Sequence, residues 1–329
     1  MEDFTHTKEE RICMDLTEFA AHVEILKQSI TSVVVGQSRT VDLLLTSILA
    51  DGHVLIEGVP GVAKTLMAKL VARLVDAGFS RVQFTPDLMP SDVLGTSVLN
   101  MKNSEFEFHR GPVFSNIVLV DEINRAPAKT QASLFEVMEE RQVTVDGHTY
   151  PMDELYVVIA TQNPVEQEGT YKLPEAQLDR FLMKITVDYP TADEELEILK
   201  RHQANASLVK LEGVRPVITR ERLLELRRLL TKVYVDDSLL NYIVQIMQQT
   251  RNSKAVFLGA SPRATVGLLR CAKAYALLQG RDFVTPEDIK FLVPFILQHR
   301  IILTAEAEIE GGSVMKLISR LVEKVEVPK

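Results

Sequence analysis

Short runs of aliphatic residues separate stretches of helical periodicity in the first 190 positions of this 329-residue chain. The apolar runs are Val54-Leu55-Ile56, residues 117–120 and residues 155–160, and a further strand is predicted at 184–187. Continuous runs of this length, rich in β-branched residues, are typical of strands that are buried on both faces of a parallel sheet. The pattern therefore predicts an α/β core.

After Pro190 the pattern becomes helical. Helices are predicted at 194–202, 219–230, 236–251, 264–278 and 285–297, with an earlier one at 16–30. Thr191 and Glu194 have the spacing of a capping box. Ser261-Pro262 and Thr285-Pro286 each place a capping hydroxyl before a proline at the first helical position. We therefore expect an N-terminal tail and helix (1–30), an α/β core (31–189) and a helical domain (190–329).

The turn after the first strand is rich in glycine and contains GVPGVAKT at positions 58–65. Small residues let successive backbone N–H groups converge on phosphate oxygens, and the helix N-terminus adds a partial positive charge. In such a loop Lys64 reaches the β- and γ-phosphates, and the Thr65 hydroxyl binds Mg²⁺. The predicted nucleotide-binding residues of this loop are Gly58, Val59, Pro60, Gly61, Val62, Ala63, Lys64, Thr65 and Leu66. Taken by itself, the segment also fits an ordinary turn from a strand into a helix.

One position departs from the usual G-x-x-x-x-G-K-[ST] pattern, because Ala63 replaces the second glycine. Alanine resists positive φ. We therefore expect the backbone at Ala63 to be close to helical geometry.

An acidic pair, Asp121 and Glu122, follows the apolar run at 117–120. Ligands of α/β sheets bind at the carboxyl ends of the strands. We expect Asp121 to hold Mg²⁺, directly or through water, and Glu122 to be the general base for the attacking water. Such a pair can also cap a helix, but the glycine-rich loop upstream favours a Walker B motif.

Two further polar residues are candidates for the same site. Asn163 follows the run at 155–160 and could orient the lytic water, although Asn163-Pro164 also fits a simple turn. Arg180, in the segment LPEAQLDRF at 173–181, has no nearby reason to be buried. A lone arginine is usually a solvated surface charge, so the local sequence leaves its role open.

The chain resembles the MoxR family of AAA+ ATPases over nearly its whole length. The resemblance is carried, in chain order, by Val35-Gly36-Gln37, GVPGVAKT (58–65), residues 119–147, ATQNP (160–164), LPEAQLDRF (173–181) and GASPRA (259–264). It implies that Asn163 is sensor 1 and that Arg180 is an arginine finger offered to the neighbouring subunit. It also implies that Arg263 is sensor 2, acting on the γ-phosphate in cis or in trans.

The same resemblance implies an architecture and an activity. The expected fold is an AAA+ P-loop αβα core with a parallel sheet and a small C-terminal all-α lid, with ATP between them and Mg²⁺ as cofactor. Adenine is expected near Val35, Gly36 and Gln37, and the family's usual loop also carries alanine where Ala63 stands. The resemblance further implies a homo-oligomeric ring, expected to be a hexamer, and a partner with a von Willebrand factor A-type domain. The output would be chaperone-like remodelling of client proteins or insertion of a metal cofactor into them.

Charge argues against a nucleic-acid partner. The net charge is −8, and two segments expected to form β-hairpin insertions lie at 88–110 and 141–154. Their only lysine and arginine residues are Lys102, Arg110 and Arg141. Proteins that track along DNA hold its phosphates with basic side chains. A nucleic-acid motor therefore remains an alternative that stimulation of hydrolysis by DNA would reveal.

Composition indicates the cellular compartment of the protein. Cys13 and Cys271 cannot form the disulfide framework of a small secreted domain, so a reducing compartment is expected. The sequence has no apolar run near the ~20 residues of a membrane span, and its first residues are polar, unlike a signal peptide. We therefore expect a cytoplasmic protein. A nucleotide-dependent scaffold with little turnover is a second alternative, which Glu122 and Arg180 disfavour.

Overall fold

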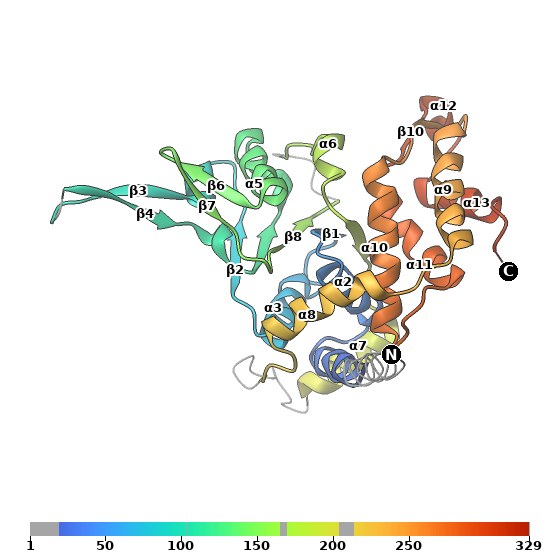
Figure 1. Ribbon diagram of the computed structural model, residues 1–329, viewed down its shortest axis with the longest axis horizontal. Coiled ribbons are helices and arrows are strands. Elements are labelled where there is room, and N and C mark those ends of the chain that lie inside the picture. Colours follow the sequence, from blue (N-terminus) through green and yellow to red (C-terminus); the bar gives the residue numbers. More distant parts are fainter. Residues whose placement is uncertain (1–19, 103, 165–169, 204–213, 329) are drawn as a thin grey trace, which may run out of the picture.

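Figure 1 shows the computed structural model, which describes residues 20–102, 104–164, 170–203 and 214–328. A core that contains the main sheet lies at the centre of the view. The helices of residues 237–323 lie along one side of it, and a long hairpin extends from the opposite side.

The core is built on a five-stranded sheet in which every neighbouring pair is parallel. Its strands are β1 (Val54–Gly58), β2 (Phe79–Gln83), β5 (Ile117–Asp121), β8 (Val157–Gln162) and β9 (Met183–Val187), in the order β2-β5-β8-β1-β9. β8 begins later than the predicted run and continues to Gln162, so it ends directly before Asn163. Because β5, β8 and β1 are neighbours, their carboxyl ends meet at what we call the carboxyl end of the sheet. The opposite end, where the strands begin, is the amino end.

Alternate residues of the central strands face two separate apolar clusters. On β5, Leu119 joins the cluster that includes α2 (Ser38–Leu49) and α3 (Lys64–Leu74), whereas Val120 joins the cluster that includes α5 (Ala128–Glu140). Helices therefore cover both faces of the sheet. This explains why the strands are continuous apolar runs in the sequence.

Two antiparallel hairpins leave the core, at the two places where insertions were expected. Their elements are α4 (Pro90–Leu94), β3 (Gly95–Asn100) and β4 (Glu105–Arg110) for the long hairpin of Figure 1, and β6 (Gln142–Val145) and β7 (His148–Pro151) for the second. In the second hairpin, Asp146 and Gly147 form the turn with φ values of 50° and 77°. Positive φ at both positions is the geometry that matches the twist of a two-residue hairpin, and the Asp-Gly pair supplies it.

The described C-terminal part is helical apart from one short pair of strands. Its elements are α7 (Ala192–Gln203), α8 (Arg220–Leu229), α9 (Asp237–Asn252), β10 (Val256–Leu258), α10 (Pro262–Leu278), α11 (Pro286–Leu297), β11 (Ile302–Leu303), α12 (Ala305–Ile309) and α13 (Val314–Glu323). Short 3₁₀ turns lie at 112–114, 123–125 and 230–232 among the described residues. The predicted caps form: Thr191 and Glu194 exchange capping-box hydrogen bonds, and Ser261 and Thr285 accept backbone N–H groups of α10 and α11. The last two helices and the β10–β11 pair were not predicted.

The N-terminal helix is described over residues 20–33, and its predicted start at Leu16 lies outside the described residues. Cys13 lies there as well, whereas Cys271 is a buried thiol of α10. Among the described helices, none is both long and apolar enough to cross a membrane.

Candidate functional site

The glycine-rich loop at 58–65 connects β1 to α3 at the carboxyl end of the sheet. A side-chain carbon on Gly58 would lie 2.6 Å from the carbonyl oxygen of Val187, so the close approach of β9 requires glycine here. Gly61 has a φ of 88° and open space around it, so its role is conformational. Lys64 begins α3, and its Nζ donates to the Gly58 carbonyl oxygen at 2.6 Å. The loop thus combines glycines, a helix N-terminus and a cation, the features that a phosphate group needs.

The backbone conformation of Ala63 differs from the expected one. Its φ and ψ are 58° and 22°, which is left-handed rather than close to helical geometry, so that prediction was wrong. Its carbonyl oxygen still accepts the hydrogen bond of the Met67 N–H at 2.9 Å, the first of α3. The left-handed conformation costs a residue other than glycine about 1 kcal/mol or more. The loop therefore keeps the backbone turn of a glycine and tolerates the strain at alanine.

Asp121, the last residue of β5, lies at the same end of the sheet. Its carboxylate accepts a hydrogen bond from the Thr161 hydroxyl at 3.1 Å and forms an ion pair with Nε of Arg81 at 2.6 Å. The Thr161 hydroxyl oxygen in turn accepts the backbone N–H of Glu122 at 3.0 Å. Sequence reasoning missed Thr161 and Arg81, because their link to Asp121 depends on how β2 and β8 flank β5.

The Glu122 carboxylate contacts two side chains of the core. Nε2 of Gln83 donates to it at 2.8 Å, and Nε of Arg125 lies 3.0 Å from it. Glu122 has a φ of 56°, a left-handed conformation at the turn out of β5. Gln83 was missed because β2 has no apolar run, although the parallel register places it directly beside Asp121.

Asn163 follows β8 directly and is buried. Because β8 lies between β5 and β1, Asn163 belongs to the same end of the sheet as Asp121 and the glycine-rich loop. The fold therefore brings together the residues predicted to hold phosphates, to activate water and to orient it. Their roles remain predictions.

The oxygen donors at this end are compatible with Mg²⁺. Thr65 supplies a hydroxyl and Asp121 a carboxylate, and Mg²⁺ typically binds one or two carboxylates together with substrate phosphates. In the described part of the chain, no group of three or more His, Cys, Asp or Glu side chains could hold a metal ion by itself. A cation at this site would therefore depend on nucleotide oxygens as well.

The predicted adenine segment, Val35, Gly36 and Gln37, links the N-terminal helix to α2. Gly36 has a φ of 75°, and the carboxylate of Glu194 occupies the space that a side chain there would take. The same carboxylate accepts the Thr191 N–H at 2.8 Å, so the start of α7 is packed against this segment.

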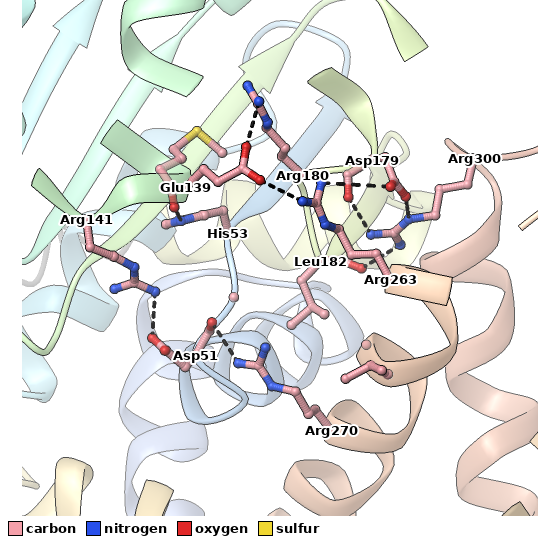
Figure 2. A pocket seen from close by; sticks show the side chains of 14 residues that line it. Asp51, His53, Glu139, Arg141, Asp179, Arg180, Leu182, Arg263, Arg270 and Arg300 are labelled. Atoms are coloured by element: carbon pink, nitrogen blue, oxygen red, sulfur yellow. Dashed lines mark hydrogen bonds and ion pairs between the residues drawn. The ribbon is translucent and has the colours of Figure 1, made fainter. Parts of the chain in front are cut away.

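The two predicted arginines lie together in a different place (Figure 2). Nη2 of Arg180 is 2.6 Å from Oε2 of Glu139, and Nη2 of Arg263 is 2.8 Å from Oε1 of the same carboxylate. Arg180 comes from the segment before β9, Arg263 from the first turn of α10, and Glu139 from the end of α5. Arg263 is also 3.9 Å from Asp179. These carboxylates compensate a cation that the dipole disfavours at the N-terminus of α10.

Topology places this cluster at the amino end of the sheet. Arg180 precedes β9, and Leu182 donates its backbone N–H to the carbonyl oxygen of His53, which directly precedes β1. The glycine-rich loop follows β1 at the other end. A five-residue strand is roughly 15 Å long, so Arg180 is separated from the glycine-rich loop of its own chain by the length of the sheet.

The cluster lines a cavity of about 280 Å³ that is rich in arginine. Its charged lining residues are Arg141, Arg180, Arg263, Arg270 and Arg300, with Asp51, Glu139 and Asp179. Five cations against three carboxylates leave a positive excess. A cavity of this composition suits an anionic ligand.

Arg300 fixes the segment that carries Arg180. It donates to the carboxylate of Asp179 at 2.7 Å and to the carbonyl oxygens of Asp179, Phe181 and Leu182 at 3.0, 2.6 and 3.1 Å. Burial lowers the pKa of the Arg300 guanidinium, and the Asp179 carboxylate opposes this shift. The C-terminal part thus forms hydrogen bonds with the backbone on both sides of Arg180. Sequence reasoning missed this contact, because more than a hundred positions separate its partners.

Of two buried histidines, His53 lines the same cavity and His299 bonds to the backbone beside it. His53 donates from Nε2 to the Met138 carbonyl oxygen at 3.1 Å and accepts the Val158 N–H on Nδ1 at 2.9 Å. Burial lowers its pKa to about 4. His299 donates from Nε2 to the Phe181 carbonyl oxygen at 3.0 Å, and burial lowers its pKa well below the ordinary value. Both rings are therefore neutral at physiological pH.

Comparison with known protein families agrees with this architecture. Residues 53–183 match the ATPase family associated with various cellular activities (AAA), and residues 248–321 match the AAA lid domain. A parallel sheet with a glycine-rich loop, followed by a lid, defines the class of AAA+ ATPases, which implies nucleotide binding.

Individual relatives narrow the class. The chain is 43% identical to "Chaperone MoxR1" of Mycobacterium tuberculosis, covering 94% of this chain and 84% of that protein. It is 49% identical to an uncharacterised protein, YeaC, of Bacillus subtilis, covering 92% and 93%. A solved structure of a putative ATPase from Cytophaga hutchinsonii superimposes with a TM-score of 0.90 at 42% identity, covering 98% and 99%. The chain belongs to the MoxR family of AAA+ ATPases.

Proposed function

We propose that this protein binds ATP together with Mg²⁺ and hydrolyses it at the carboxyl end of the sheet. The N–H groups of the glycine-rich loop and the ammonium of Lys64 bind the phosphates. Thr65 and Asp121 would hold Mg²⁺, which supplies positive charge to the phosphate oxygens when bound. The support is the convergence of these residues on adjacent strand ends.

Glu122 is proposed as the general base. Its carboxylate accepts a proton from the attacking water, and the amide of Asn163 orients that water. Gln83 and Arg125 hold the Glu122 carboxylate before it acts. This arrangement favours turnover over a scaffold that only binds nucleotide.

Arg180 and Arg263 are proposed to act in trans, on the nucleotide of a neighbouring subunit. The observation that carries this proposal is their shared position at the amino end of the sheet, remote from the phosphate loop of their own chain. Their common partner Glu139 shows that both guanidiniums point into one cavity. The γ-phosphate of the neighbour is the anion that this cavity would meet. A complete site thus needs two chains, and we propose a homo-oligomeric ring of six.

Within the ring we assign residues 31–189 to the ATPase core, 190–329 to the lid and 1–30 to an N-terminal tail and helix. The contacts of Arg300 support a mechanical link between lid and core, since they tie the lid to the segment that carries Arg180. Hydrolysis would change the angle between the two parts and pass this change to the neighbour.

The proposed output is chaperone-like remodelling of client proteins or insertion of a metal cofactor into them, with a von Willebrand factor A-type protein as partner, in the cytoplasm. The word "chaperone" in the name of the Mycobacterium relative supports this direction. The long hairpin supports it too. Leu99 and Phe106 are directly opposite each other on β3 and β4, and Met101 and Phe106 are 83% and 73% exposed. Exposed apolar side chains suit a protein surface better than nucleic-acid phosphates.

The test mixes two inactive variants. Arg180→Ala subunits keep an intact phosphate loop, and Lys64→Ala subunits keep intact arginines. Where the phosphate loop of an Arg180→Ala subunit faces the arginines of a Lys64→Ala subunit, one complete site forms, so ATPase activity should partly return. The matched control mixes Arg180→Ala subunits with Lys64→Ala/Arg180→Ala subunits, which should stay inactive. If the first mixture also stays inactive while mass spectrometry detects mixed rings, the role in trans is wrong.

A further inference from the structure

A single carboxylate, that of Glu139, binds the two arginines that the proposed mechanism needs for the neighbour's phosphate. Oε2 is 2.6 Å from Arg180 and Oε1 is 2.8 Å from Arg263, so each oxygen serves one guanidinium (Figure 2). The Glu139 side chain is 37% exposed, and those of Arg180 and Arg263 are 31% and 49% exposed. The cluster is therefore open to an incoming ligand.

The other two carboxylates of the cavity have their closest contacts elsewhere, although Asp179 also lies 3.9 Å from Arg263. Asp51 pairs with Arg141 at 2.9 Å and with Arg227 at 2.8 Å. Asp179 binds Arg300 at 2.7 Å and accepts the Ser261 hydroxyl at 2.9 Å. These pairs belong to the framework of the fold. Glu139 is the carboxylate that pairs closely with both candidate catalytic arginines.

A phosphate that enters the cavity meets Glu139 as a competitor. Phosphate and carboxylate oxygens seek the same guanidinium N–H groups. They also repel each other, because both are negative. Two arginines close together repel as well, and Glu139 removes this repulsion only while no phosphate is present. Once a phosphate neutralises the arginines, Glu139 no longer stabilises them, and its remaining electrostatic effect is to repel the phosphate.

We propose that Glu139 is an internal competitor for the neighbour's γ-phosphate, a positioning residue that holds Arg180 and Arg263 away from phosphate until two subunits meet. The inference rests on the proposed role of the arginines in trans. It identifies the ligand of the cavity as a phosphate that carries more negative charge than one carboxylate. It also means that ring assembly with ATP must displace the Glu139 contacts.

The first experiment measures ATPase rate per subunit against protein concentration. Glu139→Gln keeps the size of the side chain but removes its charge. It should lower the concentration at half-maximal rate by about threefold to tenfold, the size expected for two partly exposed ion pairs. Glu139→Asp keeps the charge and should stay close to the wild type. Glu140→Gln is the matched control on the adjacent, exposed residue of α5 and should change nothing.

The second experiment tests in which of the two subunits Glu139→Gln must be present to raise activity. A general structural role of Glu139 would not make the effect depend on the subunit. Arg180→Ala subunits are mixed with Lys64→Ala subunits, with Glu139→Gln added to one type or the other. The recovered activity at low protein concentration should rise only when Glu139→Gln is in the Lys64→Ala subunits, which donate the arginines. A rise from both placements, or from neither, overturns the proposal.

The outcomes separate this inference from the function on which it rests. If Arg180→Ala alone leaves turnover and its concentration dependence intact, the role in trans fails, and the competitor role fails with it. If Arg180→Ala is inactive but Glu139→Gln lowers the maximal rate without shifting the half-maximal concentration, the role in trans stands. In that case Glu139 holds the arginines in a productive position, and the competitor role is wrong. Thermal unfolding of each variant confirms that it is folded.

Discussion

The two ends of the sheet differ in how their functional residues are assembled. At the carboxyl end, Asp121 ends a strand, Glu122 and Asn163 each follow a strand directly, and Lys64 follows a short loop. At the amino end, Glu139, Arg180 and Arg263 come from the end of one helix, a connecting segment and the start of a lid helix. The first site is set by local sequence and strand order. The second exists only because distant segments pack together.

The two ends also hold their side chains by different forces. The carboxyl end relies on backbone geometry, with left-handed residues at Ala63 and Glu122 and a positive φ at Gly61. The amino end relies on charge, with ion pairs of Glu139 and the buried hydrogen bonds of Arg300. Such ion pairs respond to ligands and pH, whereas backbone turns do not. The following predictions test this contrast, from the largest expected effect to the smallest.

Lys64→Ala should abolish tight binding of Mg-ATP and all turnover with it. The phosphates lose a fixed cation that the N–H groups of the loop cannot replace. Isothermal titration calorimetry measures the affinity. Lys69→Ala, an exposed lysine on the same helix α3, is the matched control and should bind normally. If Lys64→Ala binds Mg-ATP with unchanged affinity, the assignment of the phosphate site to the carboxyl end of the sheet is wrong.

Arg180→Ala should reduce turnover by roughly 10³-fold or more, the size of an arginine finger elsewhere. Affinity of each subunit for ATP should stay near that of the wild type, because the residue lies at the opposite end of the sheet. The rise of rate with protein concentration should disappear. Arg215→Ala, at an exposed position of the C-terminal part, serves as control. A large loss of affinity in Arg180→Ala would mean that the two ends are not independent.

Glu122→Gln should keep ATP binding and lower turnover by a factor on the order of 10² or more, since an amide does not accept the proton of water. Single-turnover hydrolysis is the measurement. Asp121→Asn separates the two carboxylates, because it should instead weaken the dependence on Mg²⁺ concentration. Hydrolysis by Glu122→Gln near the wild-type rate would exclude the general-base role.

Acid should lower the free energy of unfolding through His53, which lies at the amino end of the sheet. The pKa of His53 is about 4 in the folded protein and near 6.5 in the unfolded chain. The unfolded state therefore binds a proton first, and stability is lost as the pH falls from 6.5 towards 4. His53 alone should lower the free energy of unfolding by about 2 kcal/mol between pH 7.5 and pH 5. Urea denaturation at both values measures this.

The matched variants for the pH experiment are His53→Gln and His109→Gln. The first should flatten the pH dependence, even if it lowers stability overall. The second changes an exposed histidine of the long hairpin and should leave the dependence unaltered. A pH dependence that His53→Gln does not alter would contradict the assignment of His53.

Much of the fold could be predicted because its signals are local. The apolar runs located β1, β5 and β8, the capping hydroxyls located the starts of α10 and α11, and Asp146-Gly147 located a hairpin turn. β2 was missed, since its sequence, Phe-Ser-Arg-Val-Gln, is neither an apolar run nor a regular alternation of polar and apolar residues. The short α12 was missed for a similar reason: five residues are too few to show helical periodicity.

The sequence by itself determined the glycine-rich loop, the acidic pair, the strands β1, β5, β8 and β9, and the resemblance to the family, because each depends on residues close together or on motifs in a fixed order. The tertiary structure decided that Ala63 is left-handed, that Gln83 and Arg125 hold Glu122, and that Arg300 grips the segment around Arg180. It also decided that one carboxylate, Glu139, pairs with two arginines from distant parts of the chain. Such contacts depend on how helices and strands pack in space. The sheet packs between its helices and the lid, and this packing brings together residues that are far apart in the sequence, so no local pattern predicts the contacts.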